Sequence, residues 1–155
     1  MSSKLYFDGS CKPYNPGGYC CYGYVLYVKG KTYSGYGYIG RGTNNQAEYA
    51  GVIEGLKKSV KLGVKSLIVR GDSQLVINHL RGNGKVKAPN LFPFFSEAVS
   101  LSKEFDEVVF EWVPREKNKK ADKLSRMAYV GLSSAMRLET SIKENIISKL
   151  NGEKK

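Results

Sequence analysis

Four acidic residues stand where expected strands and helices begin or end: Asp8, Glu48, Asp72 and Asp122. Each has an ordinary structural explanation when it is taken alone. Asp8 could shape the turn that follows it, and Glu48 could complete a helix capping box. Asp72 could cap the helix after it, and Asp122 could pair with Arg126 one helical turn later. Individually, none of the four indicates a functional site.

The expected order of strands and helices brings these carboxylates together. Asp8 and Asp72 each end a predicted strand, and parallel neighbouring strands would present both at the rim where α/β sheets place ligands. Glu48 lies in the first turn of a helix and borders its apolar stripe, so we expect it to face the sheet. Asp122 lies near the start of the last predicted helix and also borders an apolar face. We therefore expect one cluster.

Clustered carboxylates repel one another and are tolerated only when they are protonated or bind cations. Oxygen ligands favour hard ions such as Mg²⁺ or Mn²⁺ over zinc. Two such ions about 4 Å apart can clamp a phosphodiester, one activating water and the other stabilising the leaving oxygen. The net charge of +11 would draw a polyanion such as nucleic acid to the site, although it also fits a generally basic surface.

Hydrophobic patterns predict a mixed α/β fold. Strands are expected at residues 4–11, 19–29, 32–39, 66–70 and 107–113. The first helix is expected to begin with a capping box between Asn45 and Glu48 and to stop at Gly63. Further helices are expected at residues 73–81, 91–105 and 120–130. The order β-β-β-α-β-α-α-β-α predicts an antiparallel meander followed by strands that alternate with helices, in one mixed sheet.

The C-terminal tail is expected to be separate from the catalytic part of the chain. We predict a catalytic domain at residues 1–130 and a helical tail at 131–155, because a thin apolar stripe recurs at helical spacing in the tail. This stripe consists of Ala135, Leu138, Ile142, Ile146 and Leu150. It could dock on the body, bind a protein partner or stay loosely helical, and docking is our first expectation.

Cysteine usage and hydropathy indicate the compartment. Cys11, Cys20 and Cys21 form no Cys-x-x-Cys pair and His79 is distant, which disfavours a zinc site. We expect buried or half-buried thiols in a reducing environment. The mean hydropathy is −0.37, and neither a membrane span nor an apolar signal-peptide core is visible. We therefore expect a cytoplasmic protein.

The ordered set of motifs resembles the type 1 ribonuclease H family. The matching stretches are Asp8-Gly9-Ser10, Asn15-Pro16-Gly17-Gly18, Thr43 to Glu48, Asp72-Ser73-Gln74, and Asn118 to Asp122 with Leu124. The resemblance covers residues 4 to about 130. It implies a ribonuclease H-like fold, a five-stranded mixed sheet with helices on both faces. It also implies endonucleolytic cleavage of the RNA strand of RNA–DNA hybrids, leaving 5′-phosphate and 3′-hydroxyl ends. Two Mg²⁺ ions, with Mn²⁺ as a substitute, would be held by Asp8, Glu48, Asp72 and Asp122.

The resemblance also implies substrate contacts. Four amide side chains match residues that touch the minor groove, where the ribose 2′-hydroxyl distinguishes RNA from DNA: Asn15, Asn44, Asn45 and Gln74. Arg41 and Thr43 are similar to residues that hold a phosphate of the DNA strand. Ordinary loop and capping chemistry is the alternative explanation for these two.

The chain departs from the family pattern in the loop before Asp122. The histidine that this loop carries in the familiar bacterial enzymes is absent, so Arg115 or Glu116 would have to replace it. The basic helical protrusion of those enzymes is also missing. Hybrid affinity would then rest on Lys85, Lys87, Arg115, Lys117, Lys119 and Lys120, which could equally be a solvated surface. Trp112 is expected in the core, and His79 at the surface or half-buried.

Two other functions remain open at this point. The same fold could carry a nuclease or strand-transfer enzyme that prefers double-stranded RNA or DNA, because carboxylate-bound metal acts on the phosphodiester and not on the sugar. A non-catalytic nucleic-acid-binding module is the third possibility. Four carboxylates argue against that module, since a negative patch would repel the phosphates it must bind.

Overall fold

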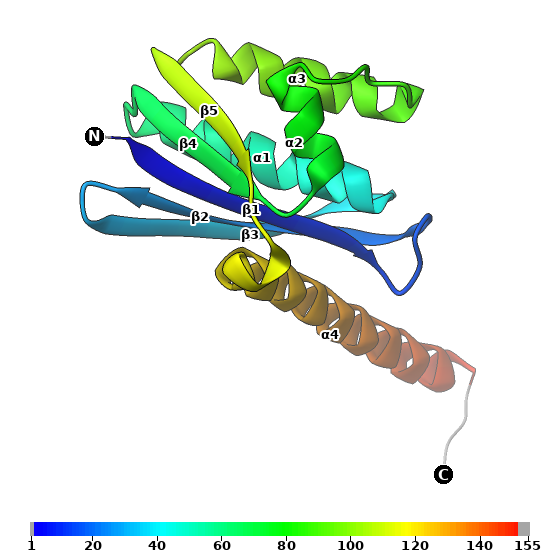
Figure 1. Cartoon of the computed structure of the whole chain (residues 1–155). Helices are drawn as coiled ribbons and strands as arrows, with labels where there is room; N and C mark the ends of the chain where they lie inside the picture. Colours follow the sequence, from blue (N-terminus) through cyan, green and yellow to red (C-terminus); the bar gives the residue numbers. More distant parts are fainter. Residues whose placement is uncertain (1, 152–155) are drawn as a thin grey trace.

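A five-stranded mixed sheet forms the centre of the computed structural model, which describes residues 2–151 (Figure 1). Its strands are β1 (Ser3–Lys12), β2 (Gly18–Val28), β3 (Lys31–Gly42), β4 (Ser66–Gly71) and β5 (Glu107–Trp112). Their order is β3-β2-β1-β4-β5. The pairs β1–β2 and β2–β3 are antiparallel, whereas β1–β4 and β4–β5 are parallel. The predicted meander with two further parallel strands is confirmed.

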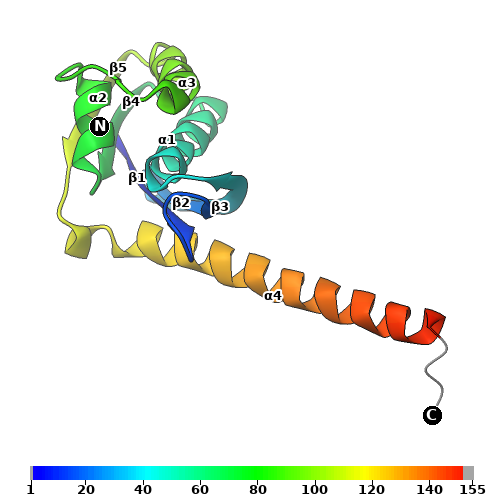
Figure 2. The ribbon, with the colours of Figure 1, turned by 90° about the vertical axis from the view of Figure 1, so that its right-hand side faces the viewer.

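Helices cover both faces of this sheet, as expected. They are α1 (Asn44–Lys61), α2 (Gln74–Arg81), α3 (Phe92–Ser102) and α4 (Lys119–Leu150), with short 3₁₀ turns η1 (Pro89–Leu91) and η2 (Arg115–Lys117). Helices α1, α2 and α3 lie on one side, and α4 crosses the other side beneath β1, β2 and β3 (Figures 1 and 2). None of the described helices has the length and hydropathy that a membrane span requires.

Both helical layers approach the sheet closely beside Asp8. Asp8 is paired with Gly23 across β1 and β2. A Cβ atom on Gly23 would lie 2.7 Å from the Leu124 Cβ of α4, and one on Gly51 of α1 would lie 2.9 Å from the Asp8 carbonyl oxygen. Such separations are too short for a side chain, so glycine is required at both positions. The contacts bring α1 and α4 against opposite faces of the sheet at the position of Asp8.

The first helix begins two residues earlier than expected. Thr43 is its N-cap: the Thr43 hydroxyl accepts a hydrogen bond from the Gln46 N–H at 3.2 Å, and Gln46 Oε1 accepts one from the Thr43 N–H at 3.0 Å. The capping box predicted between Asn45 and Glu48 is therefore wrong. Because Thr43 and Gln46 satisfy the backbone donors, the Glu48 carboxylate is not needed as a cap and remains available for the site.

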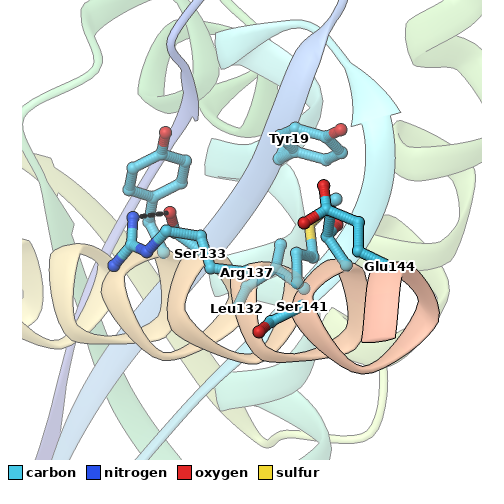
Figure 3. A pocket seen from close by; sticks show the side chains of 9 residues that line it. Tyr19, Leu132, Ser133, Arg137, Ser141 and Glu144 are labelled. Atoms are coloured by element: carbon cyan, nitrogen blue, oxygen red, sulfur yellow. Dashed lines mark hydrogen bonds between the residues drawn. The ribbon is translucent and has the colours of Figure 1, made fainter. Parts of the chain in front are cut away.

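Helix α4 continues well past residue 130 without a break. Its buried residues are Ala121, Ser125 and Ala128, and beyond them the helix extends away from the sheet (Figure 2). Tyr19 of β2 faces this extension across a cavity of about 450 Å³, which reaches along the helix to Glu144 (Figure 3). The boundary proposed near residue 130 is thus not marked by the end of a helix, and residues 152–155 of the expected tail lie outside the described residues.

Three expectations about individual side chains are wrong. Cys11 and Cys20, which are paired across β1 and β2, form a disulfide, and only Cys21 is a free, buried thiol. His79 is buried at 8% exposure, where its Nδ1 lies 2.8 Å from the Tyr49 hydroxyl, and burial lowers the pKa of its ring. Trp112 is 44% exposed and does not belong to the core. The disulfide depends on which residues of β1 and β2 lie opposite each other, and the spacing of the cysteines in the sequence does not reveal this register.

Candidate active site

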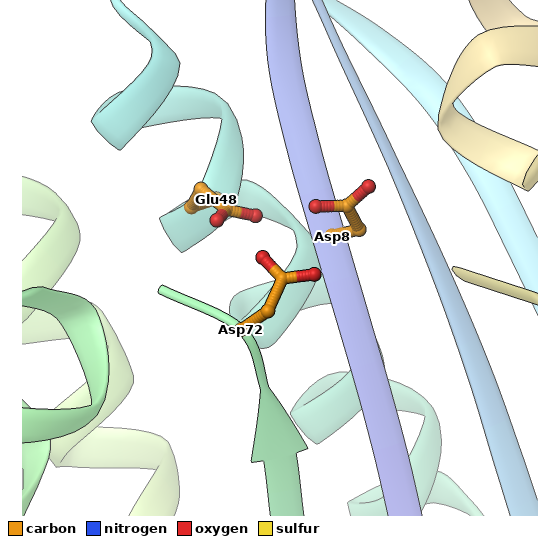
Figure 4. A group of neighbouring side chains, drawn as sticks. All are labelled: Asp8, Glu48 and Asp72. Carbon is orange, nitrogen blue, oxygen red and sulfur yellow. The ribbon is translucent and has the colours of Figure 1, made fainter. Parts of the chain in front are cut away.

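Three carboxylates from three different elements meet at the rim of the sheet (Figure 4). Asp8 lies on β1, Glu48 one turn into α1, and Asp72 directly after β4. One oxygen of each lies within 4.8 Å of the others, a spacing that allows all three to hold the same metal ion. The parallel pairing of β1 with β4 brings Asp8 and Asp72 to one rim, as expected from the strand order.

Asp122 borders this group from the opposite face of the sheet. It lies in the first turn of α4 and lines the same cavity of about 290 Å³ as the other three carboxylates. Its carboxylate is close enough to hydrogen-bond with Asp8, while its Oδ2 also accepts from Arg126 Nη2 at 3.0 Å. The structure therefore brings all four predicted carboxylates to one cavity, with three in a tight group and Asp122 at its border.

Burial and mutual repulsion favour protonation of the cluster. Burial raises the pKa of Asp8 to about 7, and the charges of Asp72 and Asp122 act in the same direction, while a hydrogen bond with Glu48 opposes them. Burial, followed by the charge of Asp8, also holds the pKa of Glu48 well above its ordinary value. A bound cation would replace the protons and remove this repulsion.

The donor set fits a divalent cation. Asp8 and Glu48 are each only 8% exposed, and the Glu48 Oε1 atom is buried without a hydrogen-bond partner among the described residues. A buried carboxylate oxygen without a partner is costly unless an ion or a water molecule satisfies it. All ligands are carboxylate oxygens, which suits Mg²⁺ or Mn²⁺ better than zinc.

Asn118 connects the elements that carry three of these carboxylates. It is 1% exposed, and its Nδ2 donates to the Phe7 carbonyl at 2.8 Å and to Asp72 Oδ2 at 3.1 Å. The backbone carbonyl of Asn118 accepts from the Asp122 N–H at 3.1 Å. The buried amide of Asn118 therefore ties β1 to the end of β4, and its backbone joins this contact to the start of α4. Sequence reasoning used Asn118 only as part of a motif and missed this role, although its place immediately before a helix beginning with Lys119 was a usable signal.

Two further polar side chains were missed. The Ser125 hydroxyl, 1% exposed, lies 3.4 Å from Asp8 Oδ2 and 2.9 Å from the Asp122 carbonyl. Lys12 lines the same cavity as the carboxylates and adds a positive charge at its edge. Ser125 would have been found by extending the helical spacing one step beyond Asp122 onto the buried face of α4.

The predicted amide contacts divide into two groups. Asn44 and Asn45 line the carboxylate cavity, at the first turn of α1. Asn44 Oδ1 accepts from the Cys11 N–H at 2.8 Å, and Asn15 Oδ1 accepts from the Asn44 N–H at 2.9 Å, so these two amides also fix the loop between β1 and β2. Gln74 is exposed at the start of α2 and is not among the residues that line the cavity.

The remaining predicted residues lie around the edge of the site. Thr43 caps α1, and Arg41 donates to the Tyr19 hydroxyl at 2.9 Å with its guanidinium 4.7 Å from the centre of the Tyr19 ring. Of the two candidates to replace the missing histidine, Arg115 lines the carboxylate cavity. Glu116 instead lines a separate groove between β1 and the start of α4.

Several known proteins are similar to this chain in sequence. A family described as reverse transcriptase-like matches residues 21–128. The bifunctional protein Rv2228c of Mycobacterium tuberculosis is 46% identical over 90 residues, which are 58% of this chain and 25% of that protein. This chain thus spans a quarter of the length of that relative. Ribonuclease HI of Halobacterium salinarum is 38% identical over 125 residues, 79% of this chain and 62% of that protein.

Solved structures show the same similarity in three dimensions. RNase H1 from Halobacterium salinarum superposes with a TM-score of 0.78 at 34% identity, over 84% of this chain and 99% of that one. LC11-RNase H1, solved in complex with an RNA/DNA hybrid, superposes with a TM-score of 0.75 at 32% identity, over 82% of this chain and 96% of that one.

Proposed function

Because this chain belongs to the type 1 ribonuclease H family, we propose that it hydrolyses the RNA strand of RNA–DNA hybrids. The tight group of Asp8, Glu48 and Asp72, bordered by Asp122, is the observation that carries this proposal. The hybrid held by LC11-RNase H1 supports the choice of substrate. The products would be a 3′-hydroxyl and a 5′-phosphate end.

The four carboxylates are proposed to hold two Mg²⁺ ions, with Mn²⁺ as a substitute. Asp8, Glu48 and Asp72 would supply the inner ligands, and Asp122 would complete the second position from α4. When bound, such ions activate the attacking water and stabilise the leaving oxygen. Asn118 would keep the Asp72 carboxylate in its orientation through the 3.1 Å hydrogen bond from its amide.

Selection of RNA is assigned to the amide side chains beside the cluster. Asn44 and Asn45 lie at the cavity, Asn15 supports Asn44, and Gln74 lies at the start of the neighbouring helix α2. Amides both donate and accept hydrogen bonds, as recognition of a ribose 2′-hydroxyl requires. Arg115 would place a positive charge against the phosphate at the cavity.

Binding of the DNA-strand phosphate is assigned to Arg41 and Thr43, which lie near the start of α1. Arg41 is held in place by Tyr19, and Thr43 begins α1. The N-terminus of a helix and a guanidinium together form a suitable anion site. The net charge of +11 supplies the longer-range attraction that brings a polyanion to this acidic centre.

A cleavage assay with four substrates tests the proposal. End-labelled RNA–DNA hybrid, double-stranded RNA, double-stranded DNA and single-stranded RNA are offered with Mg²⁺ or Mn²⁺. We expect cleavage of the RNA strand of the hybrid, and loss of at least about a thousandfold in rate in Asp8→Asn and Glu48→Gln. Glu54→Gln provides a matched control, because Glu54 lies on the same helix but pairs with Lys57 at the surface.

Three other outcomes of this assay would contradict all or part of the proposal. Preferential cleavage of double-stranded RNA or DNA would assign the chain to another activity of the same fold. Binding of hybrid without cleavage in either metal would indicate a binding module. Full activity in Asp8→Asn would contradict the assignment of the metal site.

A further inference from the structure

A basic hollow lies between the sheet and the start of α4. This lysine groove has a volume of about 490 Å³. Lys4, Tyr6, Val25 and Tyr27 line it from β1 and β2, and residues 116–121, which run from η2 into α4, line its other side. Among the described residues, none lines both this groove and the carboxylate cavity. Its volume is typical of pockets that hold small organic groups, and a single nucleotide is of that size.

The lysine groove carries an excess of positive charge. Among the described residues that line it, Glu116 is the acidic one and the basic ones are Lys4, Lys117, Lys119 and Lys120. No ion pair found within residues 2–151 involves any of these side chains. Like charges around one hollow repel each other, and an anion bound between them removes this repulsion. The groove therefore favours an anionic group such as a phosphate.

The N-terminus of α4 adds backbone donors to the same groove. Lys119, Lys120 and Ala121 begin this helix and line the groove, and no side-chain hydrogen bond caps the helix at this end. The N–H groups in the first turn of a helix have no partner within the helix, and together with the helix dipole they attract anions. A phosphate in the groove would thus meet both ammonium groups and backbone donors.

Asn118 supplies an unused acceptor. This buried residue lines the groove, and its Oδ1 has no hydrogen-bond partner among the described residues. Its Nδ2 already donates to the Phe7 carbonyl and to Asp72, so Oδ1 is the part of the amide that still lacks a partner. A buried acceptor without a partner is costly, and a donor such as a base amino group or a sugar hydroxyl would satisfy it.

Two tyrosines form the sheet side of the groove. The rings of Tyr6 and Tyr27 pack edge to face with their centres 6.0 Å apart, and both residues are only half-buried. Lys120 Nζ lies 5.6 Å from the centre of the Tyr27 ring and donates to the Tyr27 hydroxyl at 3.2 Å. Aromatic rings beside cationic side chains are typical of sites for single-stranded nucleic acid, where rings stack on bases and cations follow the phosphates.

The groove and the carboxylate cavity lie on either side of η2. Arg115 lines the carboxylate cavity, while Glu116 and Lys117 of the same 3₁₀ turn line the groove. We propose that the lysine groove binds a nucleotide of a single strand that continues beyond the end of the hybrid. Its phosphate lies against the lysines and the start of α4, and its base lies against the tyrosines. Because the strand belongs to the hybrid substrate, this site rests on the function proposed above.

Fluorescence anisotropy with the inactive variant Asp8→Asn tests this site. A blunt hybrid is compared with hybrids that carry a short single-stranded extension at one of the strand ends, each end in turn. We expect one of these extensions to tighten binding by roughly tenfold relative to the blunt hybrid, through a stacked base and its phosphate. The gain should shrink as the salt concentration rises, because the lysines act through their charge.

Substitutions in the groove should remove this gain. Lys4→Glu and Tyr27→Leu, each combined with Asp8→Asn, should bind extended and blunt hybrids equally. Each of the two alone should cleave the blunt hybrid at the wild-type rate, within about twofold, because neither residue lines the carboxylate cavity. Lys58→Glu and Tyr33→Leu are matched controls that should keep the gain, since Lys58 Nζ lies 5.4 Å from the centre of the Tyr33 ring in a similar pair outside the groove. Circular dichroism of each variant establishes that it is folded.

Cleavage of the blunt hybrid by the wild type reports separately on the proposed function. Cleavage of that hybrid without a gain from any extension would overturn the groove and leave the proposed function intact. A gain that depends on Lys4 and Tyr27 in a chain that cleaves no hybrid would support the groove and contradict the proposed function. A gain that persists in both groove variants, or that Lys58→Glu and Tyr33→Leu remove equally, would overturn the groove. Binding of free adenosine monophosphate without a gain from any extension would overturn the assignment to a strand.

Discussion

Removing one carboxylate from the cluster should stabilise the protein when no divalent cation is present. Burial raises the pKa of the Asp8 carboxyl from its ordinary value of 3.8 to about 7 in the folded protein. The folded state therefore binds the proton more tightly, and its advantage is complete below about pH 4 and lost as the pH rises through 7. This difference in pKa corresponds to at most about 4 kcal/mol of unfolding free energy. Asparagine does not ionise, so the Asp8→Asn variant does not lose this unfolding free energy as the pH rises.

The expected difference grows with pH. In the presence of EDTA, Asp8→Asn and the wild type should have similar unfolding free energies near pH 4, whereas at pH 8 the variant should be more stable by roughly 2–4 kcal/mol. The charge of Asp8 also raises the pKa of Glu48, so the substitution relieves Glu48 as well. Comparing the two proteins at each pH cancels the titration of groups outside the cluster.

Urea unfolding followed by circular dichroism measures this difference, and added Mg²⁺ should make it smaller. The wild type should gain about 1.4 kcal/mol when Mg²⁺ is present at ten times its dissociation constant, while Asp8→Asn should gain little. Glu54→Gln, an exposed carboxylate on α1, should show neither effect. If Asp8→Asn were less stable than the wild type at pH 8 in EDTA, repulsion within the cluster would not be the dominant effect and the reasoning would fail.

Four further outcomes are expected. Asn118→Ala should raise the Mg²⁺ concentration needed for half-maximal cleavage while leaving the hybrid dissociation constant unchanged, and should cost about 2 kcal/mol in urea unfolding because buried partners lose their donor. Thr43→Ala should cost about 1 kcal/mol in the same assay through loss of the cap. Thiol titration of the unreduced, unfolded chain should detect Cys21 alone, and reduction of the disulfide should lower the unfolding free energy by about 2–3 kcal/mol. Hybrid affinity of an inactive variant, measured by fluorescence anisotropy, should fall steeply between 50 and 200 mM salt, at roughly tenfold or more; a flat response would argue against phosphate contacts.

Local patterns were sufficient to predict the fold and the residues of the cluster. Alternating apolar residues and intervening glycines indicated the five strands, whose order then implied that Asp8 and Asp72 share a rim. Glu48 was assigned to the site because it borders the apolar stripe of its helix. These inferences succeed because they depend on the periods of helices and strands, which a sequence displays directly.

Features that depend on register were not predictable from spacing. Cys11 and Cys20 meet because the antiparallel register of β1 and β2 places them directly opposite each other. The start of α1 differed because both Thr43 and Asn45 are good capping residues, and Gln46 rather than Glu48 completes the box. Asn118 was missed because its two donor contacts join a carbonyl and a carboxylate that are distant in the sequence.

The packing of glycines explains how the protein maintains an unfavourable cluster. Gly23 and Gly51 allow α4 and α1 to reach the sheet on opposite faces at the position of Asp8. Any side chain at either position would push one helix outward and carry Asp122 or Glu48 away from Asp8. Separation of the carboxylates would lower their repulsion and, for the same reason, weaken their hold on a divalent cation. Close approach of the two helices is therefore what makes the site both unstable without a cation and able to bind one.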